Sequence, residues 1–227
     1  MFHARRNHGS RPGRRDRVAG LALLLIFLPA LGVSEARSET SPDAAAVRAP
    51  IERLYAALLE VMQQADELGF AGRFAKLEPV VKGTYDLEFM ASRVIGRQYQ
   101  RLEPEQQAIW LETFGRLTIS TYADRFDGFD GERLEIGDVE TSRGGTSIVR
   151  TVLYPAKDDP VQLDYRMRPN GEGEWRIVDV YLSGTVSELA LRRSDYSGVL
   201  RSDGFEALRT AVETKIAAAE AGTDDDD

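Results

Sequence analysis

The sequence predicts an α+β fold, in which one antiparallel sheet of about four strands is packed by amphipathic helices. Apolar residues recur with a helical period up to about residue 127, alternate with polar residues from 134 to 182, and then return to a helical period. The alternating segments follow one another with short turns, which favours antiparallel pairing. One apolar face of the sheet must be covered by the helices, and if the sheet is curved, an apolar cavity opens between the two layers.

The first expected helix carries an apolar stripe at the spacing i, i+3, i+4, i+7, i+8 and i+11. Pro50 suits its first turn, and Gly69 suits its end. Further on, Pro104 lies between two glutamates, which marks the start of another helix. The stripe of the first helix consists of Ile51, Leu54, Tyr55, Leu58, Leu59 and Met62. The later helices are expected over residues 70–81, 86–99 and 103–127.

Three alternating segments and one weaker segment form the expected sheet. Between residues 161 and 168, apolar residues alternate with polar ones, so this strand has one apolar face. The Asn170-Gly171 pair is a turn signal between two strands. The strands are expected over residues 134–139, which is the weaker segment, and over 146–154, 161–167 and 175–182.

Two helices and an acidic tail are expected at the C-terminal end. One helix begins near Ser187, and the last helix covers residues 204–219. The tail, residues 220–227, ends in four aspartates and is expected to be solvated and disordered. A single domain is therefore expected over residues 49–219, after a flexible lead over residues 37–48.

Residues 1–36 have the composition of a secretory signal peptide. Six arginines precede an apolar run over residues 18–33, and the small-residue pattern SEA follows at 34–36. The run contains Pro29 and is shorter than the ~20 residues of a membrane-spanning helix, so cleavage near Ala36 is favoured over an uncleaved anchor. The arginine pair just before the run also fits a twin-arginine signal. The mature protein is expected to be exported, which in a bacterium means the periplasm.

Composition excludes several classes of function. The formal net charge is −8, and removing residues 1–36, with six arginines, Asp16 and Glu35, takes away a net +4 and leaves −12. Such an acidic protein is a poor ligand for nucleic acid or for anionic lipid headgroups. The chain has no cysteine, and its two histidines, His3 and His8, lie in the leader. His- or Cys-dependent catalysis and ordinary zinc sites are therefore excluded for the mature protein, whereas carboxylate and Ser–Lys chemistry remain open.

An ordered series of short segments runs through most of the chain. It comprises residues 96–99 (GRQY), 104–107 (PEQQ), Phe114, Leu117, Tyr122, Ala123, 161–165 (VQLDY), 175–180 (WRIVDV), 183–187 (SGTVS) and 192–196 (RRSDY). This series resembles the MlaC family of periplasmic phospholipid-binding, toluene-tolerance proteins, over about residues 49–216. Residues 182–187 and 192–195 are most similar to the hopanoid-associated branch, HpnM. Thr185 looks like an extra residue beside the compact EGVS of common members.

The resemblance implies a fold, a cargo and partners. The implied fold is a curved antiparallel sheet packed by helices, related to the nuclear-transport-factor-like group. The implied cargo is a phospholipid or a hopanoid, with its tails between the sheet and the helices. The implied partners are lipid transport complexes of the inner and outer membranes, and for the hopanoid branch an inner-membrane exporter of the resistance–nodulation–division type. No cofactor and no metal are expected.

Apolar and aromatic positions on the expected elements are the candidates for lining the cavity. At such positions a side chain is more often core than ligand contact, and that interpretation stays open for each of them. The candidates are Tyr85, Phe89, Ile95, Phe114, Leu117 and Tyr122 from helices, and Val152, Leu163, Tyr165, Met167, Ile177 and Val180 from strands.

A few charged residues are also candidates. Asp179 interrupts an apolar strand end, and it is either an exposed alternating position or a buried carboxylate paired with Arg192 or Arg193. Those two arginines, together with Arg97 and Arg101, are candidates for contacting a phosphate headgroup or an acidic partner. The alternative for each arginine is an ordinary solvated side chain.

Three functions compete. We favour a lipid-binding shuttle without covalent chemistry, because exposing a lipid tail to water costs about 0.8 kcal/mol per methylene and an apolar cavity removes that cost. The second is a carboxylate-dependent enzyme acting on a lipid or polyprenoid, which is disfavoured because the inward-facing strand positions are apolar. The third is an adaptor that bridges envelope complexes through its surface, with a filled core and no ligand.

Overall fold

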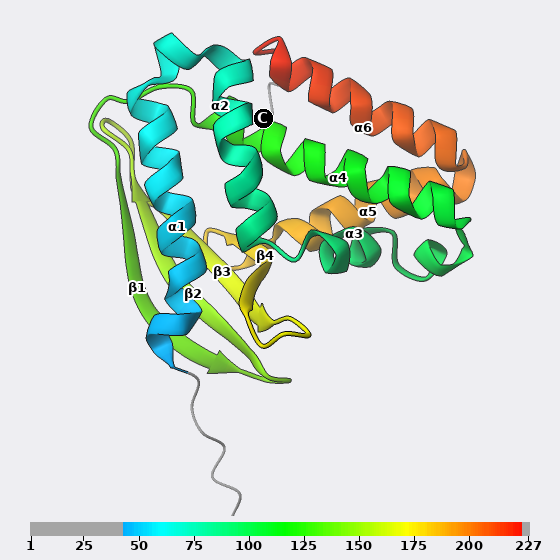
Figure 1. The fold of residues 1–227 in the computed structure, drawn as a ribbon, viewed down its shortest axis with the longest axis horizontal. Helices are drawn as coiled ribbons and strands as arrows, with labels where there is room; N and C mark the ends of the chain where they lie inside the picture. The colour runs from blue at the N-terminus through cyan, green and yellow to red at the C-terminus, as the bar shows by residue number, and fades with distance from the viewer. Residues whose placement is uncertain (1–42, 224–227) are drawn as a thin grey trace, which may run out of the picture. The chain divides into compact units, whose positions relative to one another are not determined.

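The computed structural model of the protein describes residues 43–223. The predicted signal peptide, the first part of the predicted lead and the end of the predicted tail lie outside these residues. Within them, helices accompany a five-stranded antiparallel sheet (Figure 1), which confirms the prediction of mixed helices and antiparallel strands. No helix of this part of the chain combines the length and the apolarity needed to cross a membrane.

The order of the elements follows the change of period in the sequence. The helices before the sheet are α1 (Ala44–Gln63), α2 (Ala65–Thr84), α3 (Leu87–Ile95), the 3-10 helix η1 (Gly96–Arg101) and α4 (Pro104–Arg125). The strands are β1 (Arg133–Ser142), β2 (Thr146–Tyr154), β3 (Val161–Pro169), β4 (Trp175–Leu182) and β5 (Val186–Ser187), and the last helices are α5 (Glu188–Ser202) and α6 (Phe205–Glu220).

Helix α1 begins earlier than predicted. The Asp43 carboxylate caps it by accepting a backbone N–H of the first turn at 3.0 Å. The flexible lead predicted over residues 37–48 is therefore wrong for residues 44–48, and Pro50 lies inside the helix rather than in its first turn. Val47 accounts for the extension, because it continues the apolar stripe by one turn and is fully buried. That burial offsets the backbone hydrogen bond that proline cannot donate.

The helix end predicted at Gly69 is a kink inside α2, since α1 already ends at Gln63. Gly69 has φ 56° and ψ −177°, a backbone conformation that is essentially restricted to glycine. Beyond the kink the helix continues to Thr84, so the helix predicted over residues 70–81 is confirmed and is slightly longer.

Helix α4 packs against three other helices, α2, α3 and α6. A capping box between Glu103 and Gln106 starts it, in agreement with the predicted start. Trp110 is fully buried, and its Nε1 donates to the Ala91 carbonyl oxygen at 2.9 Å, which ties α4 to α3. Helices α2 and α6 also pack against α4 (Figure 1).

The sheet is a meander with the order β1-β2-β3-β4-β5. The predicted bounds of β2 and β4 are confirmed, whereas β1 is longer than predicted and β5 is a short fifth strand. Register shifts interrupt β1 between Ile136 and Val139, and the β3–β4 pairing next to Met167. Helix α1 contacts β1, β2 and β4, so it lies on the inner face of the sheet.

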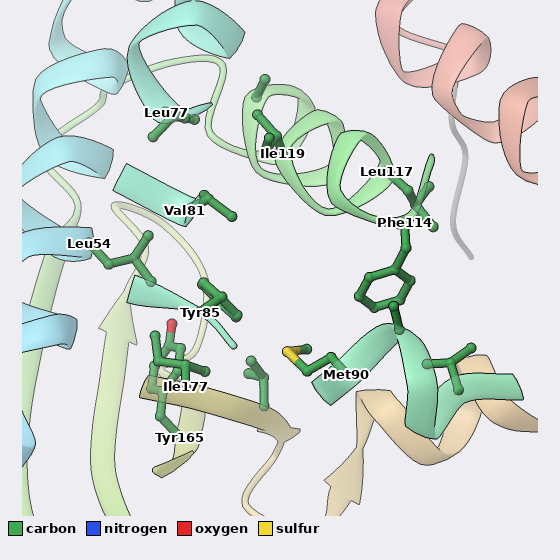
Figure 2. Packing of buried hydrophobic residues seen from close by; sticks show 14 of the residues in the cluster. Leu54, Leu77, Val81, Tyr85, Met90, Phe114, Leu117, Ile119, Tyr165 and Ile177 are labelled. Atoms are coloured by element: carbon green, nitrogen blue, oxygen red, sulfur yellow. The ribbon is translucent and has the colours of Figure 1, made fainter. Parts of the chain in front are cut away.

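The core fills the space between this face and the helices. Figure 2 shows side chains from both layers pointing toward one another. The labelled residues of the sheet are Tyr165 and Ile177. Those of the helical layer are Leu54 from α1, Leu77 and Val81 from α2, Tyr85 from the segment between α2 and α3, Met90 from α3, and Phe114, Leu117 and Ile119 from α4.

Candidate functional site

A cavity of about 540 Å³ lies between the sheet, α4 and the start of α5. Its sheet wall comes from the inner face of β2, β3 and β4, and its opposite wall from the C-terminal half of α4. The loop after α4, residues 126–132, borders it on one side. The apolar lining residues include Met62, Met90, Phe126, Leu153, Leu163, Val180, Leu182 and Leu189.

Three tyrosines line the cavity from different parts of the chain. The hydroxyls of Tyr85 and Tyr122 are hydrogen-bonded to each other, and both side chains line the cavity together with Tyr165. Deeper in the core, Tyr55 bonds the Thr151 hydroxyl at 2.5 Å, and its ring meets the Tyr165 ring edge-on at 5.9 Å. Burial raises the pKa of Tyr85, Tyr122 and Tyr165 well above the usual value, so these phenols stay neutral at ordinary pH.

The mouth of the cavity is charged. Arg125, at the end of α4, and Arg192, on α5, lie on either side of Glu188. Three more carboxylates line the mouth, and two large apolar side chains there are partly exposed, Phe129 at 42% and Val161 at 38%. The carboxylates are those of Asp127, Asp130 and Glu132. The cavity therefore has a largely apolar interior and an entrance that carries both signs of charge.

Asp179 supports this mouth without lining the cavity. It is buried and accepts hydrogen bonds from the Ser187 hydroxyl at 2.7 Å and from the backbone N–H groups of Val180 and Leu189 at 2.9 and 3.1 Å. Burial raises its pKa, while these hydrogen bonds act in the opposite direction. Asp179 thus holds the N-terminus of α5. Its burial agrees with the second alternative from the sequence, but its partners are Ser187 and backbone N–H groups instead of Arg192 or Arg193.

The structure brings five of the twelve predicted lining residues to this cavity. These are Tyr85, Tyr122, Leu163, Tyr165 and Val180. Ile95, Phe114, Leu117, Met167 and Ile177 lie in the packed core instead.

Neither of the other two lines the cavity: Phe89 packs, partly buried, against the core, and Val152 is not part of the core. The Phe89 ring is half-buried under the guanidinium of Arg168, whose Cζ is 3.9 Å from the ring centroid. Val152 is on the outer face of β2, because Val149 and Thr151 point inward and strand side chains alternate.

Sequence reasoning missed several lining residues. The alternation in β2 would have identified Leu153, which lies on the same face of the strand as the buried Val149 and Thr151. Arg125 carried no sequence signal of its own, since an arginine at a helix end is common. Of the four candidate arginines, Arg192 lines this cavity, whereas Arg97, Arg101 and Arg193 do not.

A second cavity of about 710 Å³ lies between α2, α3 and α4. Phe74, Leu111 and Ile119 contribute apolar surface to it, and several charged residues surround them. Tyr85 lines both cavities, so its hydrogen bond to Tyr122 lies at the boundary between them. Among residues 43–223, no group of three or more carboxylate, His or Cys side chains is arranged to hold a metal ion.

Comparisons with known proteins agree on one family. The family model described as "MlaC protein" matches residues 52–214. The intermembrane phospholipid transport system binding protein MlaC of Haemophilus influenzae (strain Rd) is 26% identical over 132 residues, which cover 56% of this chain. The aligned part spans 61% of that relative's length.

A solved structure shares the fold. It is a phospholipid-binding protein from Ralstonia solanacearum in complex with a phospholipid, with a TM-score of 0.66 and 18% sequence identity. The match covers 76% of this chain and 98% of the other. At this identity the likeness establishes the arrangement of helices and sheet.

Proposed function

The chain belongs to the MlaC family, and we propose that it is a phospholipid-binding transport protein that holds lipid tails in the cavity between the sheet and helices α4 and α5. The observation that carries the proposal is the cavity itself. Its interior is walled by leucine, methionine and neutral tyrosine side chains, and its entrance is charged. A lipid has the same division into apolar tails and a polar headgroup.

The energetics explain why such a carrier needs no covalent chemistry. Exposing a lipid tail to water costs about 0.8 kcal/mol per methylene, so free transfer through water is strongly disfavoured. A protein cavity as apolar as a bilayer makes exchange between the two nearly isoenergetic. Transport then requires binding and release, and its direction is set by partners that favour one state of the carrier. We therefore propose a carrier that is not an enzyme.

The finer assignment is a shuttle in the periplasm between inner- and outer-membrane lipid transport complexes. The signal-like composition of residues 1–36 supports export. The likeness of residues 182–187 and 192–195 to the HpnM branch supports a hopanoid as an alternative cargo, with an exporter of the resistance–nodulation–division type as partner. The meander sheet and its helical cover support a relation to the nuclear-transport-factor-like group.

Native mass spectrometry of the purified protein, followed by organic extraction and lipid identification, tests the proposal. Bound phospholipid or hopanoid at about one molecule per chain supports it and identifies the cargo. A protein that carries no lipid and takes none from vesicles would instead favour the adaptor.

The variant Leu163→Asp tests the position of the cavity. Leu163 lines it from β3, and a buried carboxylate there is incompatible with an acyl tail, so we expect bound lipid to fall by about tenfold or more. Val152→Asp is the matched control, because Val152 is half-buried on the neighbouring strand but on the opposite face. Circular dichroism checks that both variants fold, and equal loading of the two variants would place the lipid elsewhere.

A further inference from the structure

An arginine–carboxylate–arginine arrangement lies at the mouth of the cavity. Glu188 Oε1 is 3.7 Å from Arg125 Nη1, and Glu188 Oε2 is 3.9 Å from Arg192 Nη2. Arg125 is the last residue of α4, whereas Glu188 and Arg192 are one turn apart on α5. All three side chains line the cavity. Two guanidiniums thus approach a single anionic group, one at each of its oxygens.

The geometry leaves the carboxylate displaceable. Charge-assisted hydrogen bonds have N···O distances of about 2.7–2.9 Å, so both contacts of Glu188 are long for ion pairs. An anion that reaches the guanidiniums more closely would interact more strongly. The Arg192 side chain is only 17% exposed and that of Glu188 25%, and partial burial strengthens such interactions.

Arg192 is held in place independently of Glu188. Its Nη1 donates to the Thr118 hydroxyl on α4 at 3.4 Å, and its Cζ lies 5.8 Å from the centroid of the Phe114 ring. The guanidinium therefore has contacts with α4 that do not depend on the carboxylate. The Glu188 side chain, by contrast, could turn toward water without breaking those contacts.

We propose that Arg125 and Arg192 form a subsite for a phosphodiester group and that Glu188 is the counter-ligand that this group displaces. The inference rests on the proposed function, because the phosphodiester is that of a bound phospholipid. A phosphodiester has two non-bridging oxygens, and it can present one to each guanidinium as the carboxylate does. Arginine is well suited to such planar, multidentate recognition of phosphate.

The surroundings favour release over tight retention. Asp127, Asp130 and Glu132 line the same mouth, so their charges oppose an anionic group there. Glu188 acts in the same direction, since it competes for both arginines and pairs with them once the phosphodiester leaves. Because a carrier has to deliver its lipid, a site that binds phosphate only moderately serves transport better than a strong one.

The test compares transfer of two lipids with the same acyl chains, a phospholipid and a diacylglycerol that lacks the phosphate. Purified protein is loaded with either lipid, and its first-order transfer to phosphatidylcholine vesicles is followed by fluorescence. We expect Glu188→Gln to slow phospholipid transfer about threefold to fivefold, the scale of a partly exposed ion pair. The double variant Arg125→Gln/Arg192→Gln is expected to accelerate it by a similar factor. Diacylglycerol transfer should stay unchanged in both.

Arg193→Gln is the matched control, because it removes one positive charge from α5 at a residue that does not line the cavity. A change in diacylglycerol transfer as large as that for phospholipid would overturn the subsite, since the substitution would then act on the cavity as a whole. A different result would assign the subsite to free phosphate. In that case Glu188→Gln leaves phospholipid transfer unchanged, but inorganic phosphate at constant ionic strength stabilises this variant, and the lipid assignment is overturned. If the parent protein takes up neither lipid, the proposed function itself fails, and the subsite fails with it.

Discussion

At the scale of single residues, Asp179 shows how a buried carboxylate can position a site that it does not line. Its oxygens accept hydrogen bonds from the N–H groups of Val180 and Leu189 and from the Ser187 hydroxyl, so it holds the first turn of α5 against β4. Glu188 and Arg192 extend from that same part of α5 into the mouth of the cavity. The positions of Glu188 and Arg192 at the mouth therefore depend on Asp179, which does not line the cavity.

The raised pKa of Asp179 predicts a specific pH dependence of stability. The folded protein binds a proton here more readily than the unfolded chain, so this contribution is complete below the unfolded pKa of about 3.9 and is lost as the pH rises through the folded pKa. Asp179→Asn removes the titration. We expect the unfolding free energy of the parent, relative to this variant, to fall over that pH window, as measured by urea unfolding. A relative stability that is constant or rises with pH would contradict the raised pKa.

At the scale of elements, the kink in α2 turns the chain after α1 so that the rest of α2 can pack on both α1 and α4. Residues 65–68 form a short helical turn, Gly69 leaves the helical conformation, and the helix resumes at Phe70. Beyond the kink, α2 buries Leu77 and Val81 in the core (Figure 2). It ends next to Tyr85, which lines both cavities.

Two glycines of α2 are expected to respond oppositely to alanine. Gly69→Ala places a β-carbon on a backbone with φ 56° and ψ −177° and should destabilise the protein by about 1–3 kcal/mol. Gly83→Ala lies in the helical part, where an added β-carbon meets no atom within 4 Å, and should stabilise it by about 0.5–1 kcal/mol. Chemical denaturation of both variants measures the difference. Equal effects would mean that the kink does not need glycine.

At the scale of the whole molecule, the described domain has one core that continues from the sheet into the helices. Helix α1 and the sheet enclose one part of it, and α4 with α3, α5 and α6 encloses another. The cavity lies where α4 and α5 approach the sheet, so a ligand there would bridge the two parts. Filling the cavity should then stabilise the domain as a unit.

Thermal unfolding checks this expectation. At a free lipid concentration of a hundred times the Kd, binding to the folded state alone stabilises by about 2.7 kcal/mol. For a domain of this size, that corresponds to a rise in Tm of about 5–10 °C. The protein stripped of lipid and the reloaded protein are compared by calorimetry, and Leu163→Asp should show no such rise. An identical Tm with and without lipid would argue against binding in the cavity.

The sequence predicts the order and type of the elements and the approximate bounds of most of them, because helical and strand periods are local properties of the chain. It was wrong at the start of α1, where the buried Val47 outweighs the signal of Pro50. Tertiary packing sets which apolar side chains face the cavity, since core and cavity-lining positions share the same period. It also brings Arg125 and Arg192, far apart in the sequence, together at Glu188, and no local pattern indicates how α4 and α5 pack.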